Sequence, residues 1–309
     1  MNHPAEYILQ QILNTLQLAA FYAPLSVAFA LIQSITRRVF LSFGDCAMFG
    51  SFAAVYFCFS RLVQGDSDLM AAAISLIAAM ACAGALGWAI ARGIFGPLVK
   101  SDALAFMIAG IGFSIVLEES MRIATNSGDI WIPGLFEGQS LQLVGGDYPV
   151  HITANGGFAM IISVVGVLAA LGVLRFTRFG LAWQACSQNL RLALLCGINT
   201  QNVIAATFVL GTALAAVSGW MTAITYGGTS FSVGVMLGFK AMFAAVAGGF
   251  GSIRGAIAGA VSLATLEVLW SASFGSVYRD VAVFCIIIIV LLLKPEGLDG
   301  DATRRESEA

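Results

Sequence analysis

The stretch "AAVAGGFGSIRGAIAGA", residues 244–260, decides how this chain folds. Its glycines include Gly249, Gly251 and Gly255, and on a first reading their spacing looks like a nucleotide-phosphate loop. Such a loop follows a strand and opens a helix within a soluble βαβ unit. Here the flanking segments are long and apolar instead. The small residues must therefore be explained by the packing of helices in lipid.

The composition places the chain in a membrane. Hydrophobic residues make up 59% of the sequence and charged residues only 10%, whereas soluble domains carry about 25% charged residues. A bilayer core is crossed by roughly 20 apolar residues in a helix. We expect an all-α polytopic integral membrane protein with about eight to ten transmembrane helices. The nine candidate spans are 13–35, 40–60, 69–91, 103–117, 158–176, 203–224, 233–250, 255–272 and 279–293.

The basic residues predict an orientation. If the N-terminus is external and the spans alternate in direction, the external side of the membrane holds only three of the basic residues, Arg61, Arg122 and Arg279. This asymmetry follows the positive-inside rule and predicts a multi-pass protein of the bacterial inner membrane with a cytoplasmic C-terminus. The eleven basic residues of the cytoplasmic segments would be Arg37, Arg38, Arg92, Lys100, Arg175, Arg178, Arg191, Arg254, Lys294, Arg304 and Arg305.

We expect one transmembrane domain over residues 1–309 and no separate soluble domain. Its external loop region would cover residues 118–157, which contain several acidic residues. Residues 177–202 would form a cytoplasmic segment, and residues 294–309 a cytoplasmic polar tail.

Small residues in the opening stretch predict a helical hairpin. They recur every four residues on each arm, a spacing that lets helix backbones approach closely in lipid. The chain would turn at Gly251-Ser-Ile-Arg254, on the cytoplasmic side, although one long kinked helix is an alternative. The predicted packing and turn residues are Ala241, Ala245, Gly248, Gly249, Gly251, Arg254, Gly255 and Gly259.

Three charged residues lie within predicted spans and away from the span ends, namely Asp45, Lys240 and Glu267. On the two arms of the hairpin, Lys240 and Glu267 would each lie about 16–18 Å from the turn, at similar depth. Charges inside a bilayer usually face a partner or a cavity. We therefore expect these two to approach each other or share a polar cavity, or else Lys240 contacts polar groups elsewhere. Asp45 would line the pathway, approach a dimer axis, or snorkel at the surface.

The segment 177–202 is amphipathic rather than uniformly apolar. Its apolar or small residues recur at helical spacing, compatible with short helices on the membrane surface or on a partner. Gly197 followed by Asn199 suits a helix stop before the next span. From these residues, an interfacial linker and a coupling helix that inserts into a cytoplasmic ATPase both remain open. The apolar or small positions are Leu181, Ala185, Leu192, Leu195 and Cys196.

A set of motifs carries a family resemblance. The chain reads "RFGLA" from residue 178, "GIN" from 197, "FVLGTALAAVSGWM" from 208 and "GFKAMFAAVAGGFGSIRGAIAGA" from 238. It also contains "GIGFSIVLEE", "IPGLFEG" and "LLLKPEGL". Together these resemble the permeases of ABC importers for branched-chain amino acids, the LivH/LivM type. The chain departs from that pattern in "FLSFGD", residues 40–45, where Phe40 and Phe43 replace the usual Asn and His.

The resemblance implies a permease subunit of an ATP-driven importer. Its partners would be a second permease subunit (identical or not), two cytoplasmic ABC ATPase subunits, a periplasmic solute-binding protein and membrane lipid. Branched-chain amino acids are the usual solutes of the family, and similar permeases serve urea, short amides and other small polar solutes. The resemblance assigns ATPase coupling to Arg178, Phe179, Gly180, Ala185, Asn189, Arg191, Ala193, Gly197 and Asn199.

The chain lacks the motifs of an enzyme. A P-loop ends in Gly-Lys-Ser/Thr, but Lys100, Lys240 and Lys294 each follow an apolar residue rather than glycine. ATP would therefore be hydrolysed by a separate chain, and we expect no catalytic residue, cofactor, metal or nucleic acid. Two rival functions remain. One is a secondary transporter or channel with Asp45, Glu118 and Glu267 as ion or proton sites, and the other is a structural assembly subunit.

Overall fold

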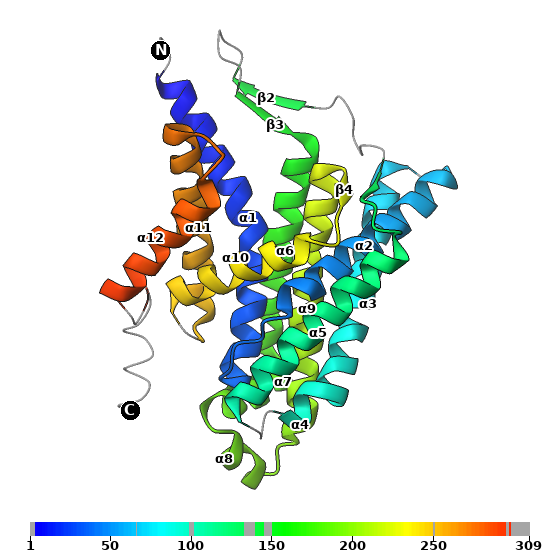
Figure 1. Ribbon diagram of the computed structural model, residues 1–309, viewed down its shortest axis with the longest axis vertical. Coiled ribbons are helices and arrows are strands. Elements are labelled where there is room, and N and C mark those ends of the chain that lie inside the picture. The colour runs from blue at the N-terminus through cyan, green and yellow to red at the C-terminus, as the bar shows by residue number, and fades with distance from the viewer. Residues whose placement is uncertain are drawn as a thin grey trace.

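The computed structural model describes residues 4–65, 67–98, 102–132, 140–144, 150–249, 251–294 and 297. Most of these residues form helices that run along the long axis of the molecule (Figure 1). We call the end of the bundle that carries α8 the α8 end, and the opposite end, with the N-terminus and the strands β2 and β3, the β2 end (Figure 1).

The helices are α1 (Pro4–Thr36), α2 (Phe43–Val63), α3 (Asp68–Ile90), a π-helical turn η1 (Ala91–Phe95), α4 (Gly96–Leu98), α5 (Ala103–Ala124), α6 (Ala154–Phe176), α7 (Arg178–Gln188), α8 (Leu190–Leu195), α9 (Thr200–Tyr226), α10 (Val233–Gly248), α11 (Ile253–Phe274) and α12 (Arg279–Leu293). Within the described residues, four short strands form two antiparallel pairs, β1 with β4 and β2 with β3. They are β1 (Ile130–Trp131), β2 (Ser140–Val144), β3 (Val150–Thr153) and β4 (Gly228–Thr229).

The predicted fold class is confirmed, because apolar helices of membrane-crossing length dominate the chain. All nine predicted spans coincide with helices, and seven of the described helices are long and apolar enough to cross a membrane. The other two, α10 with 16 residues and α12 with 15, are shorter. At 1.5 Å per residue they measure about 24 and 22 Å, less than the roughly 30 Å of a hydrocarbon core. These two helices are therefore too short to cross the hydrocarbon core at a right angle to the membrane plane.

The boundaries of the predicted loop region need correction. We expected residues 118–157 to be a loop, but α5 continues to Ala124 and α6 already begins at Ala154. The acidic residues Glu118 and Glu119 therefore lie on a helix, where Glu119 pairs with Arg122 at 2.7 Å, one turn later. Such pairs at i and i+3 support a helix against the local polarity that indicated a loop.

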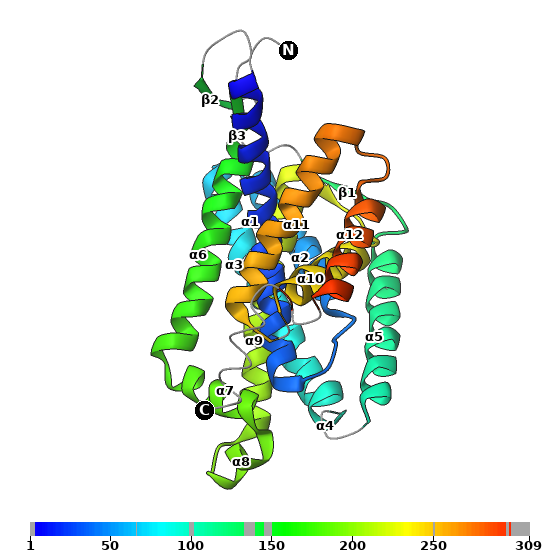
Figure 2. The ribbon, with the colours of Figure 1, turned by 90° about the vertical axis from the view of Figure 1, so that its left-hand side faces the viewer.

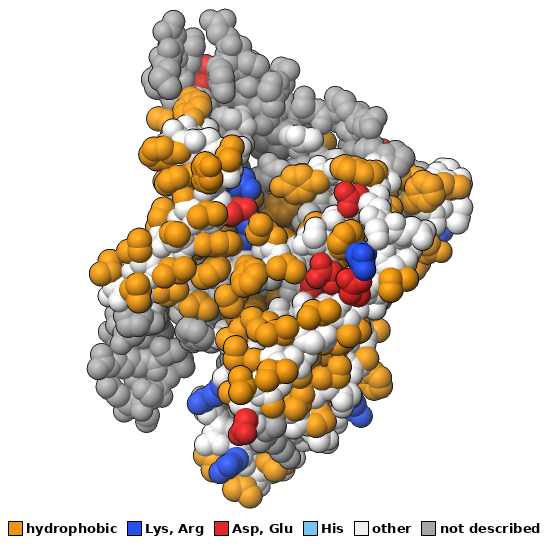
Figure 3. Space-filling view, in the orientation of Figure 1, with side chains coloured by type: hydrophobic (Ala, Val, Ile, Leu, Met, Phe, Trp, Pro, Cys, Tyr) orange, Lys and Arg blue, Asp and Glu red, His pale blue; other side chains and the backbone are white. Residues whose placement is uncertain are grey.

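Helices α1 and α9 form the centre of the bundle, and other helices surround them. In the most apolar 18-residue stretch of each helix, 83% of α1 and 78% of α9 is buried. The corresponding buried share is 17% in α5 and 28% in α6. Helices α5 and α6 lie on opposite outer sides (Figures 1 and 2). Apolar side chains cover most of the outer face in Figure 3, as expected for surface that faces lipid.

Two helices begin inside the bundle rather than at its ends. The Phe43 ring, at the start of α2, packs against Phe29 with centroids 5.8 Å apart, and Phe29 lies about 10 Å before the end of α1. At the start of α10, a Cβ on Gly234 would lie 2.6 Å from the Asp45 carboxylate. The non-helical segments before α2 and α10 are tolerated at this depth because protein, not lipid, surrounds them.

Candidate functional site

The glycine-rich stretch forms a turn between α10 and α11, so the chain does not continue as one kinked helix. Gly249 has φ 121° and Gly251 has φ 79°, a region that glycine enters without a Cβ clash. The Ser252 side chain caps α11 by accepting a hydrogen bond of 3.0 Å from the Gly255 amide. A Cβ on Gly251 would lie 3.8 Å from Ser34, near the end of α1. The tip of the hairpin, with the exposed Arg254, therefore points toward the α8 end.

The two arms of this hairpin touch through backbone atoms. A Cβ on Gly248 would lie 1.8 Å from the Gly255 carbonyl oxygen, and one on Gly259 would lie 1.9 Å from the Ala244 carbonyl oxygen. Ala241 and Ala245 are also buried. Small residues at four-residue spacing permit this approach. Any larger side chain on this seam would push the arms apart.

The structure places Lys240 and Glu267 in one buried cluster. Lys240 Nζ lies 3.0 Å from Glu267 Oε1 and 3.1 Å from Asp280 Oδ1. The hydroxyl of Tyr22 accepts a hydrogen bond of 3.0 Å from Lys240 and donates one of 2.9 Å to Glu267. Arg279 Nε lies 3.6 Å from Glu267 Oε2. We call Tyr22, Lys240, Glu267, Arg279 and Asp280 the ion cluster.

Sequence reasoning missed three members of the ion cluster. Asp280 and Arg279 stand at the start of a predicted span and read as boundary residues. Tyr22 is an aromatic residue in an apolar helix, which is most simply explained as packing. A polar tip on a buried aromatic side chain usually finds a hydrogen-bond partner, and that rule was the available signal. The cluster joins α1, α10, α11 and α12, so it holds four helices together.

Asp45 is buried where α2 meets α10, which rules out a snorkelling position at the surface. Its side chain is 2% exposed, and Oδ2 accepts a hydrogen bond from Ser114 of α5. Its other oxygen, Oδ1, has no hydrogen-bond partner within the described residues. The two helices touch here through glycines, because a Cβ on Gly44 would lie 2.0 Å from the Gly234 carbonyl oxygen. Asp45 is separate from the ion cluster in its contacts.

The segment 177–199 forms two short helices with identifiable caps. Asn189 caps α8 by accepting hydrogen bonds of 3.0 and 3.2 Å from the amides of Arg191 and Leu192. Asn199 caps α9 in the same way with a bond of 3.2 Å from Asn202. Gly197, with φ 85°, ends α8. Three of the residues assigned to coupling by resemblance therefore have a local structural role, which is to set the turns of this segment.

One face of α7 and α8 packs on the bundle and the other is free. The buried face contains Gly180, Trp183, Cys186 and Ala193, whereas Ala185 is half-buried. Gly180 is required at its position because a Cβ there would lie 1.8 Å from the Leu174 carbonyl oxygen of α6. The opposite face is exposed, with Arg178 and Arg191 on it. We call its leucines, which are 55–82% exposed, the leucine surface: Leu181, Leu192, Leu194 and Leu195.

Arg37 ties this segment to the central helix. Its Nη2 donates hydrogen bonds of 3.1 and 2.8 Å to the carbonyl oxygens of Ser187 and Gln188, at the end of α7. A cation at a helix C-terminus is favoured by the helix dipole. These hydrogen bonds join the end of α7 to the residue that follows α1.

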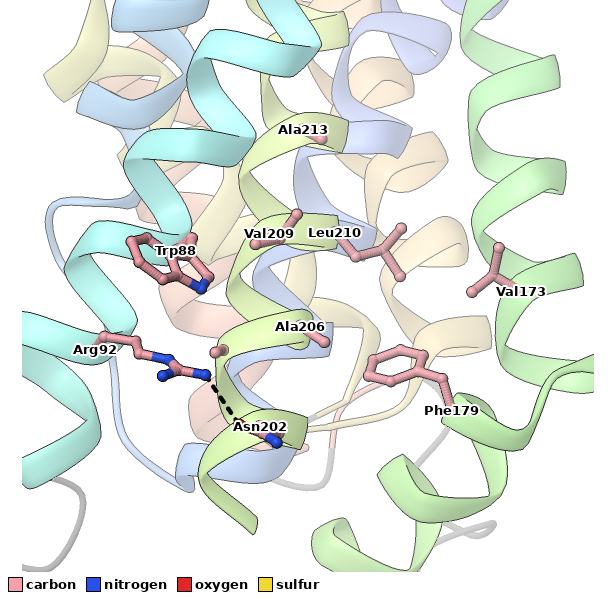
Figure 4. Close-up of a pocket in the computed structure, with 10 residues that line it drawn as sticks. Trp88, Arg92, Val173, Phe179, Asn202, Ala206, Val209, Leu210 and Ala213 are labelled. Carbon is pink, nitrogen blue, oxygen red and sulfur yellow. Dashed lines mark hydrogen bonds between the residues drawn. The ribbon is translucent and has the colours of Figure 1, made fainter. Parts of the chain in front are cut away.

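Phe179 lines a groove between α3, α6 and α9 (Figure 4). The groove has a volume of about 530 Å³ and mainly apolar walls, including Val173 and Leu210. At its edge, Arg92 donates a hydrogen bond of 3.0 Å to Asn202, and its guanidinium lies 5.5 Å from the Trp88 ring centroid. Phe179 thus points toward the transmembrane helices in Figure 4, rather than adding to the leucine surface.

These features define a class of protein. An apolar helical bundle with a buried ion cluster, two helices that begin at mid-depth and an exposed apolar surface at one end is characteristic of a multi-pass membrane protein. Comparison with known sequences gives the family. The model described as "Branched-chain amino acid transport system / permease component" matches residues 11–292, and the chain belongs to this family.

Individual relatives agree with the family. The high-affinity branched-chain amino acid transport system permease protein LivH of Salmonella typhimurium is 35% identical over 295 residues, which cover 95% of this chain and 96% of LivH. BraD of Pseudomonas aeruginosa, a permease of the same description, is 33% identical over 298 residues, with coverage of 95% and 96%. The chain is thus a permease subunit of an ABC importer, a transport subunit rather than an enzyme.

Proposed function

We propose that this permease carries branched-chain amino acids, or small polar solutes of similar size, inward through the membrane. The observation that carries the proposal is the similarity to LivH and BraD over nearly the whole length of both proteins. Urea and short amides are the alternative solutes. The ion cluster also weighs against a secondary transporter, because Glu267 is already neutralised by Lys240 at 3.0 Å.

The proposed orientation puts the α8 end in the cytoplasm and the β2 end outside. Arg37, Arg92, Arg178 and Arg191 lie at or beside the α8 end, in agreement with the positive-inside rule. In this orientation the C-terminus is cytoplasmic. A solute-binding protein would then dock at the β2 end, and a second permease subunit would lie beside this one in the membrane.

Two separate ATPase chains would bind at the α8 end, one of them on this subunit. The leucine surface suits such a partner because four large apolar side chains are exposed beside Arg178 and Arg191. When the ATPases close on ATP, they would displace α7. Arg37 would carry that motion to α1, which bears Tyr22 of the ion cluster. Backbone contacts such as Gly259 on Ala244 allow helices to slide without opening voids.

Reconstitution tests this function directly. The permease is co-expressed with an ATPase, a second permease and a binding protein of the branched-chain amino acid type, and the complex is placed in liposomes. We expect leucine with its binding protein to stimulate ATP hydrolysis and to be taken up. A complex whose ATPase lacks its P-loop lysine is the control and should do neither. Uptake driven by an ion gradient without ATP would refute the importer and favour the secondary transporter.

A further inference from the structure

The groove that Phe179 lines is built mainly on one helix. Helix α9 forms its floor, α3 with the turn η1 forms one wall, and α6 with the start of α7 forms the other (Figure 4). We call it the α9 groove. Its volume of about 530 Å³ is within the range of small-molecule sites. The floor residues, all apolar except the first, are Asn202, Ala205, Ala206, Val209, Leu210 and Ala213.

The α9 groove extends from the membrane surface inward over one leaflet. From Asp68, the first residue of α3, to Trp88 the helix rises about 30 Å, the thickness of a hydrocarbon core. Trp88, which is 51% exposed, therefore stands at the headgroup level, where tryptophan is enriched. From Asn202 to Ala213 the floor rises about 16 Å, roughly half of the core. The groove thus has the length of one acyl chain in the leaflet at the α8 end.

The width of the α9 groove fits a hydrocarbon chain rather than a helix. A volume of about 530 Å³ over a length of about 16 Å gives a cross-section of about 33 Å². A helix with its side chains is at least about 10 Å across and occupies about 80 Å². A neighbouring transmembrane helix is therefore too wide to enter the groove, whereas an acyl chain is not.

The mouth of the groove carries positive charge. Arg92, an exposed residue of η1, donates a hydrogen bond of 3.0 Å from Nη2 to Asn202, and its guanidinium lies 5.5 Å from the Trp88 ring centroid. These contacts hold the guanidinium at the groove but supply no negative charge. Among the described residues no carboxylate pairs with Arg92, nor with the exposed Arg175 and Arg178, which belong to α6 and α7 of the opposite wall. Guanidinium groups bind phosphate through charge-assisted hydrogen bonds.

A negative headgroup and an apolar chain are the two parts of an anionic phospholipid. A soluble phosphate compound would satisfy Arg92 but leave the apolar floor uncovered. A zwitterionic lipid would place its cationic group beside Arg92 and the arginines of the opposite wall. Basic pockets between transmembrane helices are general binding sites for anionic headgroups. Of these ligands, only the anionic phospholipid matches both the mouth and the floor of the groove.

We infer that the α9 groove binds an anionic phospholipid of the leaflet at the α8 end, with its phosphate on Arg92 and one acyl chain along α9. Phe179 belongs to α7 and lines the same groove, so the bound lipid contacts α7 and the bundle together. The lipid would thus stabilise the segment through which coupling is proposed to act. The site does not depend on which solute is transported, so it goes beyond the proposed function.

The test locates lipids on the protein by photolabelling. The full chain, purified with the subunits that accompany it, is placed in phosphatidylcholine nanodiscs with a trace of a diazirine-bearing probe. One probe is phosphatidylglycerol, which is anionic, and the other is phosphatidylcholine with the same chains. Mass spectrometry counts adducts on residues 202–213, and the exposed outer face of α6 is the reference for general lipid contact. We expect about tenfold more groove adducts from the anionic probe, the effect of one charge-assisted contact.

Two pairs of variants separate the proposed contacts from general attraction. Arg92→Gln should lower the groove adducts of the anionic probe about tenfold, to the phosphatidylcholine level. Arg191→Gln is its control, since it changes an exposed arginine of α8 outside the groove, and it should leave the adducts unchanged. Ala206→Phe fills the floor and should reduce the adducts of both probes, whereas Ala169→Phe on the exposed face of α6 should reduce neither.

Three results would overturn the site. The first is equal groove labelling by the two probes, or unchanged labelling in Arg92→Gln. The second is the absence of any groove adduct while α6 is labelled, because protein would then cover the groove. The third is displacement of the anionic probe by millimolar sn-glycerol 3-phosphate, which would show that the ligand is a soluble phosphate compound. Arg92→Gln changes an exposed side chain and should fold normally, so its result decides even if Ala206→Phe does not fold.

Hydrogen exchange tests the contact with α7 independently of transport. Replacing phosphatidylcholine with phosphatidylglycerol in the nanodisc should slow amide exchange over residues 178–188 in the wild type, and this protection should be lost in Arg92→Gln. Equal exchange in the two lipids would overturn the stabilisation of α7. If leucine transport fails while the lipid results hold, the proposed solute is wrong and the lipid site stands.

Discussion

Replacing Lys240 with methionine (Lys240→Met) is the most informative perturbation of this bundle. It removes the cation that contacts Glu267, Asp280 and Tyr22 at 3.0 to 3.1 Å and leaves Glu267, 1% exposed, in an apolar interior. Removing one partner of a buried ion pair typically costs about 3–5 kcal/mol. Glu267 keeps the Tyr22 hydroxyl at 2.9 Å and Arg279 at 3.6 Å. We therefore expect a loss at the lower limit, about 3 kcal/mol.

The double variant distinguishes pairing from mere burial. Glu267→Gln alone strands Lys240 with Asp280 and should also destabilise the protein. Lys240→Met combined with Glu267→Gln removes both charges, so it should cost less than the sum of the single variants by about 2 kcal/mol or more. The free energy of unfolding is measured by denaturant titration in mixed micelles. Additivity of the two single losses to within about 0.5 kcal/mol would refute the reasoning.

The remaining predictions concern the hairpin, the leucine surface and the orientation. Gly259→Ala should destabilise the protein by about 1–3 kcal/mol, since its Cβ would lie 1.9 Å from a carbonyl oxygen, whereas Gly172→Ala, with open space around it, should be neutral in the same unfolding titration. Leu195→Glu on the 82% exposed leucine should abolish co-purification with the ATPase without lowering the melting temperature; retained ATPase would contradict the proposed surface. In single-cysteine variants, an impermeant maleimide should label the exposed Cys196 in inside-out vesicles only. The same reagent should label Cys186 slowly, because burial raises the pKa of that thiol and so lowers its thiolate fraction at neutral pH. Labelling of Cys196 in right-side-out vesicles would reverse the proposed orientation.

Family membership and the ion cluster explain different properties of this protein. Similarity to LivH over 95% of the chain assigns the transport class. The cluster explains how four helices with apolar surfaces are held in one arrangement. Lipid supplies no hydrophobic driving force between helices, so packing and polar contacts between them must do so. Tyr22, Lys240 and Glu267 provide such contacts at the meeting point of α1, α10 and α11.

The sequence alone was sufficient to predict the membrane class, the helices that coincide with the nine spans, and the break between α10 and α11. These features depend on local properties. Hydropathy over about 20 residues is read directly along the chain, and the turn needs glycines such as Gly249 and Gly251 at positive φ. The family resemblance, carried by motifs after residue 40, was confirmed by comparison. The roles assigned to individual residues of the coupling segment remain predictions.

Only the tertiary structure decided which polar groups meet and which faces pack. Tyr22 and Glu267 are 245 residues apart, and nothing local to either indicates the other. The pattern of α7 did not show that Gly180 and Trp183 face the bundle while Leu181 is exposed. In a membrane protein, lipid-facing and protein-facing surfaces are both apolar, so hydropathy cannot tell them apart. The close approach of backbones, and the few polar contacts buried between them, select one arrangement from the many that the apolar pattern permits.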